Sequence, residues 1–110
     1  MIWKVATFNV NGIRARLQHV LDWLQAHEPD VLCLQEIKCT TEQFPSDAFA
    51  PLNYVASVHG QKAFHGVAIL SRRAPDEVLT GFHDGGDDEE ARLIAARFDS
   101  IWVVNTYVPQ

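Results

Sequence analysis

The sequence predicts a single α/β domain in which a mixed β-sheet is layered with helices. Two apolar, β-favouring stretches flank a segment whose hydrophobic residues recur at helical spacing, and several short apolar stretches follow with turn residues between them. At 110 residues and 47% hydrophobic, the chain has enough apolar material for one modest core, so disorder is not expected.

The N-terminal part of this prediction is a strand, a helix and a second strand. Residues 2–8 (IWKVATF) are nearly all apolar, as expected for a strand covered on both faces. From Ile13 the apolar residues recur at helical spacing as far as residue 27, and Pro29 ends the helix. Residues 31–35 (VLCLQ) then form a second buried strand. The short connections imply that the two strands pair in parallel.

Shorter strands follow, and they leave little room for helices. PSDAFAPL (45–52) predicts one short helix, and strands are expected over residues 54–58, 66–71, 77–82, 92–98 and 101–107. Strands this closely spaced pair mostly antiparallel, which gives one mixed sheet of about seven strands. One long helix covers little of such a sheet, and a strong strand reaches almost to the last residue, so we expect a chain that is cut short.

Charge neither supports nor excludes a phosphate-bearing ligand. The net charge is −5, but five of the fourteen acidic residues lie in HDGGDDEE (83–90), which is typical of a solvated loop. The remaining sequence carries nine basic and nine acidic residues and is neutral.

Cysteine usage and hydropathy indicate a cytoplasmic protein without a membrane partner. Cys33 and Cys39 lack the spacing of a metal site, so two reduced thiols are expected. The apolar runs are too short to cross a bilayer, and the N-terminus lacks the pattern of a signal peptide.

Polar side chains lie at or just beyond the carboxyl ends of three of the predicted strands, where open α/β sheets bind ligands. These residues are Asn9 and Asn11, Gln35 and Glu36, and Asn105 and Tyr107. Taken singly, each is also typical of an ordinary turn, surface or packing position. Their recurrence at successive strand ends predicts a site.

The chemistry of these residues suits Mg²⁺ and a phosphate group. A single carboxylate at Glu36 with amides beside it fits a hard cation that keeps several waters, and it does not fit structural zinc. Lys38 could orient that carboxylate or meet a phosphate. The phenol of Tyr107 could donate to a phosphoryl oxygen.

Five segments together resemble a known family. FNVNGIRARL, PDVLCLQEIK, HGQKAFHGVAILSR, EEARLIAARF and VVNTYVPQ resemble the successive motifs of the exonuclease III branch of apurinic/apyrimidinic endonucleases, in the endonuclease/exonuclease/phosphatase superfamily. The resemblance implies a four-layer, deoxyribonuclease-like α/β sandwich of which residues 1–110 form the N-terminal half. It also implies Mg²⁺ dependence, with Mn²⁺ as a substitute, and hydrolysis of phosphodiesters beside abasic sites.

The resemblance also implies roles for individual residues. Glu36 is the metal ligand, and Asn11 is a second metal-binding candidate where some members carry Asp. Tyr107 and Asn9 are the catalytic candidates, and Lys38 orients the carboxylate. The implied partner is double-stranded DNA with abasic sites or 3′ ends. Residues that match DNA-contacting positions are Arg14, Lys62, Phe64, Arg92 and Gln110.

The family places an Asp and an Asn in a later GDxN-type motif and an Asp–His pair near its C-terminus, and none of these exists in this sequence. The chain alone is therefore expected to be inactive, and to self-associate or to need its C-terminal half. Two alternatives stay open: a non-catalytic interaction module with the same sheet, and a related phosphodiesterase that acts on RNA, nucleotides or phospholipids.

Overall fold

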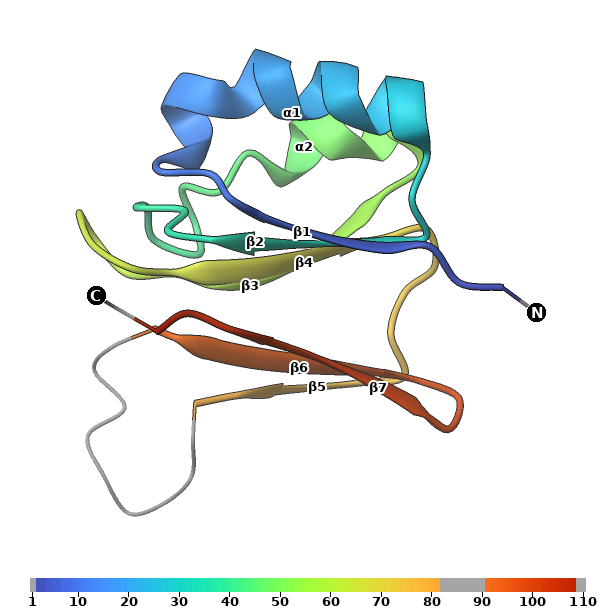
Figure 1. Ribbon diagram of the computed structural model, residues 1–110. Coiled ribbons are helices and arrows are strands. Elements are labelled where there is room, and N and C mark those ends of the chain that lie inside the picture. The colour runs from blue at the N-terminus through green and yellow to red at the C-terminus, as the bar shows by residue number, and fades with distance from the viewer. Residues whose placement is uncertain (1, 82–90, 109–110) are drawn as a thin grey trace.

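The computed structural model, which describes residues 2–81 and 91–108, has three layers (Figure 1). Helices lie on one face of a four-stranded sheet, and a three-stranded sheet lies on its other face. The elements are β1 (Val5–Asn9), α1 (Ile13–His27), β2 (Val31–Gln35), α2 (Ser46–Phe49), a 3₁₀ turn (Ala50–Leu52), β3 (Val55–His59), β4 (Val67–Ser71), β5 (Glu77–Thr80), β6 (Leu93–Phe98) and β7 (Ile101–Thr106).

The larger sheet has the strand order β1-β2-β4-β3, and the smaller has the order β5-β6-β7. β1 and β2 pair in parallel, with Val5 opposite Val31 and Asn9 opposite Gln35, and the other ladders are antiparallel. The predicted α/β class, the parallel pair, the long helix and the antiparallel pairing of the later strands are confirmed.

The expectation of one sheet of about seven strands is wrong, because the strands divide between two sheets that face each other. The apolar alternation of a strand indicates which side chains are buried, and it does not indicate which strand is the hydrogen-bonded neighbour. The smaller sheet therefore supplies the cover for the larger sheet that the predicted helices could not.

A second correction concerns β1, which was expected to be covered on both faces. It lies at the edge of the four-stranded sheet, and Val5 and Phe8 are 52% and 39% exposed. An edge strand has one strand neighbour, so its side chains lack the cover that β2 receives from both sides. The apolar sequence of β1 therefore marks an uncovered surface.

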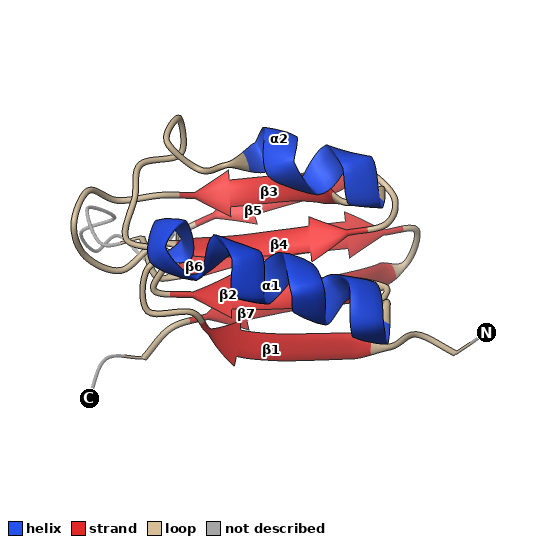
Figure 2. Cartoon of the chain, turned by 90° about the horizontal axis from the view of Figure 1, so that it is seen from above, coloured by secondary structure: helices blue, strands red, loops and turns tan. Residues whose placement is uncertain are grey.

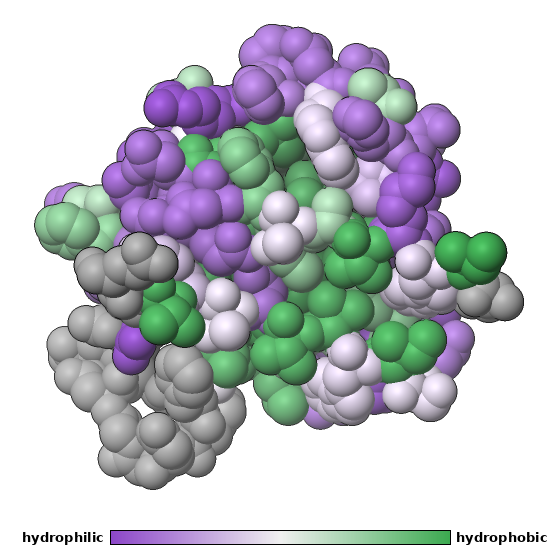
Figure 3. Space-filling model, in the orientation of Figure 1, coloured by the Kyte–Doolittle hydropathy of each residue, from purple (hydrophilic) through white to green (hydrophobic). Residues whose placement is uncertain are grey.

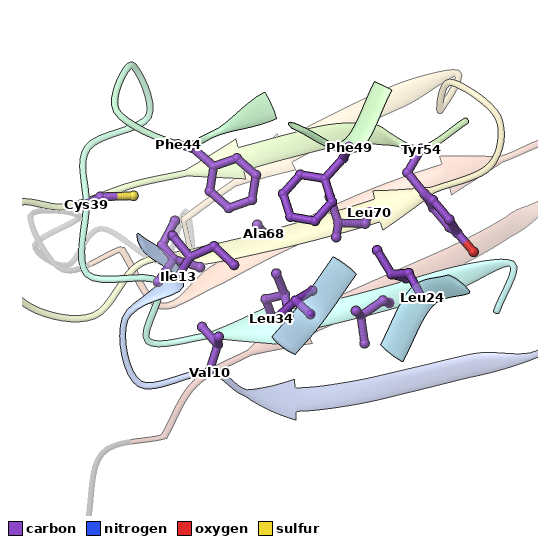
Figure 4. Close-up of a cluster of buried hydrophobic side chains, with 13 residues drawn as sticks. Val10, Ile13, Leu24, Leu34, Cys39, Phe44, Phe49, Tyr54, Ala68 and Leu70 are labelled. Carbon is purple, nitrogen blue, oxygen red and sulfur yellow. The ribbon is translucent and has the colours of Figure 1, made fainter. Parts of the chain in front are cut away.

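Two apolar clusters hold the layers together. The first lies between the helices and the larger sheet, where Ile13 and Leu24 of α1 pack with Leu34 and with Phe49 of α2 (Figure 4). The second lies between the two sheets, where Ile69 of β4 meets side chains of β6 that include Phe98. Burial of these side chains fixes the spacing of the three layers.

Both sheets are open on the same side of the molecule. β1 and β7 each have one ladder partner among the described residues, and the two strands lie on the same flank in both views (Figures 1 and 2). A hollow between them is lined by residues of both strands, including Val5 and Val104. A hydrophobic patch lies in the middle of this side, below a mostly hydrophilic upper part (Figure 3).

No helix in the two described ranges is long and apolar enough to span a membrane. The predicted acidic loop at 83–90 and the candidate Gln110 lie outside the described residues.

Candidate active site

The parallel pairing of β1 and β2 brings two of the polar strand ends together. Beyond the strands, the amides of Val10, Gly12 and Ile13 donate to the carbonyls of Gln35, Glu36 and Ile37, at 3.0, 2.8 and 3.0 Å. These bonds hold the turn that follows β1 against the segment that follows β2. Asn9 and Glu36 therefore lie side by side, and the roles given to them from the sequence stay predictions.

Glu36 is the carboxylate at the centre of this arrangement. Its Oε2 accepts a hydrogen bond of 2.5 Å from Nδ2 of Asn9, and the Asn9 Oδ1 accepts one of 3.1 Å from the amide of Asn11. The side chain of Glu36 is 23% exposed, so the carboxylate is held by the protein and still reaches the surface. Its backbone is left-handed, with a φ of 54°, a conformation that costs a non-glycine residue free energy.

Lys38 connects Glu36 to Asn11. Its Nζ lies 4.0 Å from Oε1 of Glu36 and donates a hydrogen bond of 2.6 Å to Oδ1 of Asn11. Asn11 therefore presents its side-chain oxygen to the ammonium group in this structure. A metal ion bound at Glu36 would compete with the Lys38 ammonium group for the Oδ1 atom of Asn11. The orienting role that the family resemblance implies for Lys38 stays a prediction.

The third strand end reaches the same place from the smaller sheet. An open hollow of about 460 Å³ is lined by Asn9 and Glu36 from the larger sheet and by Thr106, Tyr107 and Val108 from the smaller. The Tyr107 ring is partly buried against the apolar layer between the sheets. The three polar strand ends predicted from the sequence thus surround one hollow.

The predicted DNA-contacting residues that the structure describes are not among those that line this hollow, and they lie in different settings. Arg14 is exposed at the start of α1, and its Nη2 donates to the carbonyl of Lys38 at 3.5 Å. Lys62 and Phe64 lie in the loop 60–66, where Phe64 is 66% exposed. Arg92 is half-buried, and its carbonyl accepts a hydrogen bond of 2.8 Å from the amide of Tyr107.

The loop 60–66 is fastened to the segment that carries Glu36. The amides of Ile37 and Lys38 donate to the carbonyls of Gly66 and His65 at 3.1 and 3.0 Å, and the amide of Gln61 donates to the carbonyl of Cys39 at 3.0 Å. The exposed Lys62 and Phe64 are therefore held at a fixed place relative to the carboxylate.

Sequence reasoning assigned no role to His65, yet its ring centroid lies 5.7 Å from that of Tyr107. Its backbone is left-handed, with a φ of 52°. No motif identifies this contact, because it depends on the way in which the loop 60–66 folds back toward the end of β7.

The cysteines take no part in the site. Cys33 and Cys39 are both buried and unbridged. Burial raises the pKa of the Cys33 thiol to about 11, and burial also raises that of Cys39 although Arg14 opposes the shift. The described residues contain no cluster of three or more His, Cys, Asp or Glu side chains that could hold a metal ion. Glu36 is thus not part of any such cluster among the described residues.

The geometry defines a class of protein. Its members have a layered α/β fold with amides and one carboxylate at the ends of the strands. The chain belongs to the Endonuclease/Exonuclease/phosphatase family, whose model matches residues 6–107. The resemblance drawn from the motifs is thereby confirmed.

Named relatives narrow the comparison. The chain is 38% identical to exodeoxyribonuclease III of Haemophilus influenzae, over 97% of its own length and 42% of that protein. Among solved structures, an AP endonuclease from Archaeoglobus fulgidus matches with a TM-score of 0.90 and 43% identity, over 98% of this chain and 42% of that one. A 3′ phosphatase from Neisseria, bound to a product DNA hairpin, matches with a TM-score of 0.92 and 38% identity. The chain therefore spans about two-fifths of the length of these proteins.

Proposed function

We propose that this chain is the N-terminal half of a DNA-repair phosphodiesterase of the exonuclease III type, which cleaves beside abasic sites and removes nucleotides from 3′ ends. The observation that carries the proposal is the hollow in which Asn9, Glu36 and Tyr107 meet from two sheets. The names of the relatives support DNA as the substrate. The cytoplasmic location expected from the sequence stays a prediction.

Glu36 is the residue that would hold a divalent metal ion. Mg²⁺ takes one or two carboxylates and keeps several waters, and Mn²⁺ accepts the same oxygen ligands. The Glu36 carboxylate fits this requirement, because one oxygen accepts from Asn9 while the other lies 4.0 Å from Nζ of Lys38 and the side chain reaches the surface. When bound, the ion would neutralise charge that develops on phosphate oxygens.

The other residues would bind and orient the phosphodiester. Asn9 holds the carboxylate in place, and the hydroxyl of Tyr107 can donate to a phosphoryl oxygen. The positive groups of Arg14 and Lys62 would meet the DNA backbone, and the exposed ring of Phe64 offers an apolar contact to the groove. The roles proposed for Asn11, Arg92 and Gln110 stay predictions from the family motifs.

The experiment uses a protein of the relatives' full length that contains this chain. Glu36→Gln keeps the shape of the side chain and removes its charge, so metal-dependent nicking of an abasic duplex should fall by about three orders of magnitude or more. The measurement is kcat with saturating Mg²⁺.

The matched control is Glu28→Gln. Glu28 is also a left-handed glutamate, but it follows the opposite end of α1 and faces Arg72. Its replacement should leave kcat within about twofold of the parent. Near-normal turnover by Glu36→Gln would exclude the metal role. If the parent protein itself does not nick abasic DNA, a panel of RNA, nucleotides and phospholipids would distinguish another phosphodiesterase, which cleaves one of them, from a non-catalytic module, which cleaves none.

A further inference from the structure

Asn105 is a buried polar residue that joins the two sheets. It lies on β7 and is 2% exposed. Its Nδ2 donates to the carbonyls of Leu34 and Ala68, both at 2.9 Å, and its Oδ1 accepts from Nε2 of Gln35 at 2.7 Å. All three partners belong to the larger sheet. One side chain of the smaller sheet therefore forms hydrogen bonds to two strands of the larger sheet, β2 and β4.

The same set of bonds continues to the edge of the larger sheet. Nε2 of Gln35 also donates to Oγ1 of Thr7 on β1, at 2.8 Å. Both hydrogens on Nδ2 of Asn105 are used, which fixes the orientation of that amide. We name Gln35 and Asn105 the amide clamp.

The amide clamp lies immediately behind the candidate catalytic residues. Gln35 directly precedes Glu36, and Asn105 lies two residues before Tyr107. Gln35 also lines the hollow in which these residues meet. Each amide is therefore at most two residues from a candidate catalytic side chain, so a change in its position also moves that side chain.

The surrounding contacts between the sheets do not fix such a position by themselves. The layer between the sheets is apolar, with side chains such as Ile69, Ala96 and Phe98. Apolar burial is non-directional, whereas a hydrogen bond weakens steeply as its angle departs from linearity. The directional bonds of the amide clamp define how far β7 can slide along the larger sheet.

We infer that Gln35 and Asn105 are positioning residues that set the placement of the Tyr107 hydroxyl relative to the Glu36 carboxylate. The inference rests on the proposed function for its catalytic consequence. It assigns a positioning role to one buried amide, Asn105, and one partly exposed amide, Gln35, whereas the family motifs assign the catalytic and metal-binding roles to their neighbours Tyr107 and Glu36. Misplacement of a catalytic group by about 1 Å is enough to lower turnover by about a hundredfold.

The first experiment compares Asn105→Leu with Phe98→Leu in the full-length protein. Asn105→Leu keeps the approximate volume and removes every bond of the clamp amide. Phe98→Leu weakens the same apolar layer at its other end, beside Trp3. We expect kcat to fall about ten- to a hundredfold for Asn105→Leu, with KM changed less than about threefold, and we expect Phe98→Leu to keep kcat within about threefold.

A milder variant covers the case in which Asn105→Leu does not fold. Gln35→Met is nearly isosteric, lies at a partly exposed position and removes the bonds to Asn105 and Thr7. It should lower kcat in the same direction without a matching change in KM. The proposal is overturned if Gln35→Met keeps parental kcat, or if Phe98→Leu lowers kcat as much as the clamp variants do.

The second experiment needs no activity and so separates this inference from the proposed function. The 110-residue chain contains two tyrosines, and Tyr54 lies in the other core, where its hydroxyl donates to the carbonyl of Pro29 at 2.6 Å. Fluorine NMR of the fluorotyrosine-labelled chain therefore gives one reporter at the site and one reference. Clamp variants should shift and broaden the Tyr107 resonance and leave that of Tyr54 unchanged.

The two experiments have distinguishable failures. If the unmodified full-length protein does not nick abasic DNA, the proposed function fails, and the fluorine spectra still decide whether the amide clamp positions Tyr107. If nicking is observed but the Tyr107 resonance is the same in parent and clamp variants, the positioning role is wrong.

Discussion

Glu36 combines a useful carboxylate with an unfavourable backbone. Its φ of 54° lies in the left-handed region, where a side chain with a Cβ is held at a cost of about 1–2 kcal/mol. Asparagine adopts this conformation more readily than glutamate. A residue that adopts this conformation more easily than glutamate would therefore make the folded chain more stable. Such a loss of stability is expected at positions where function requires a particular residue.

The substitution Glu36→Asn should therefore raise the free energy of unfolding by about 0.5–1 kcal/mol, because it relieves this strain. Glu28→Asn is the matched control, since Glu28 has a φ of 47° and its ion pair with Arg72 is exposed. Urea unfolding should show a similar gain for both variants. Only Glu36→Asn should abolish metal-dependent nicking, and a loss of stability at Glu36 alone would contradict the strain argument.

At the scale of residues, sequence reasoning identified Asn9, Glu36 and Tyr107 because a polar side chain directly after an apolar strand is conspicuous. It counted Gln35 and Asn105 among the polar strand ends but gave neither amide a role of its own. Their importance depends on which strands face each other across the two sheets, and a sequence pattern does not contain that information. The contact of His65 with Tyr107 escaped for the same reason.

At the scale of elements, the loop 60–66 depends on a glycine at its start. A Cβ on Gly60 would lie 2.4 Å from the amide nitrogen of Thr41 and 2.5 Å from the carbonyl oxygen of Cys39. Both are backbone atoms and cannot move independently of the segment that follows Glu36. Gly60 therefore allows the loop with Lys62 and Phe64 to lie directly against that segment.

Gly60→Ala should lower the free energy of unfolding by about 1–3 kcal/mol, because one of the two packed segments must shift. Ala63→Gly is a contrast in the same loop, since Ala63 has a φ of 68° and loses strain when its Cβ is removed. Chemical denaturation should show a lower midpoint for Gly60→Ala and an unchanged or higher midpoint for Ala63→Gly. An unchanged midpoint for Gly60→Ala would show that the loop is not closely packed.

Helix and strand positions could be predicted well, because apolar periodicity reports burial directly. α1 was expected at residues 13–27 and is found there. The division into two sheets could not be predicted, since β4 and β5 follow each other with ordinary turn residues between them. The exposure of β1 was also missed. An apolar sequence indicates that a strand is suited to burial, but it does not indicate whether residues 1–110 supply the side chains that bury it.

At the scale of the whole molecule, the open flank at β1 and β7 predicts self-association of the 110-residue chain. Within residues 2–81 and 91–108, each of the two edge strands has one side without a ladder partner, beside exposed side chains that include Val5, Trp102 and Val104. Open strand edges next to apolar surface are templates for pairing with another chain. We expect the additional residues of a protein of the relatives' length to cover this flank, which stays a prediction.

Light scattering on the purified chain should therefore give a mass above that of a monomer. Val104→Lys places a charge on the edge strand β7 and should shift the population toward monomer, whereas Gln25→Lys on the exposed face of α1 should not.

The chain should not nick abasic DNA until a C-terminal half is added. A stable monomer with metal-dependent nicking would contradict both the open flank and the incomplete site.

The bonds of Asn105 also bear on the order in which the molecule is built. Asn105 and Leu34 are 71 positions apart, so their contact closes one of the longest loops in the chain. Contacts between distant positions are slow to form, because the loop must close before any stabilising bond is made. The helices and the larger sheet, by contrast, use residues that precede β5. During synthesis on a ribosome, the helices and the larger sheet can form before β7 has been synthesised. The hollow that contains Glu36 is lined from both sheets only after β7 has packed against the larger sheet.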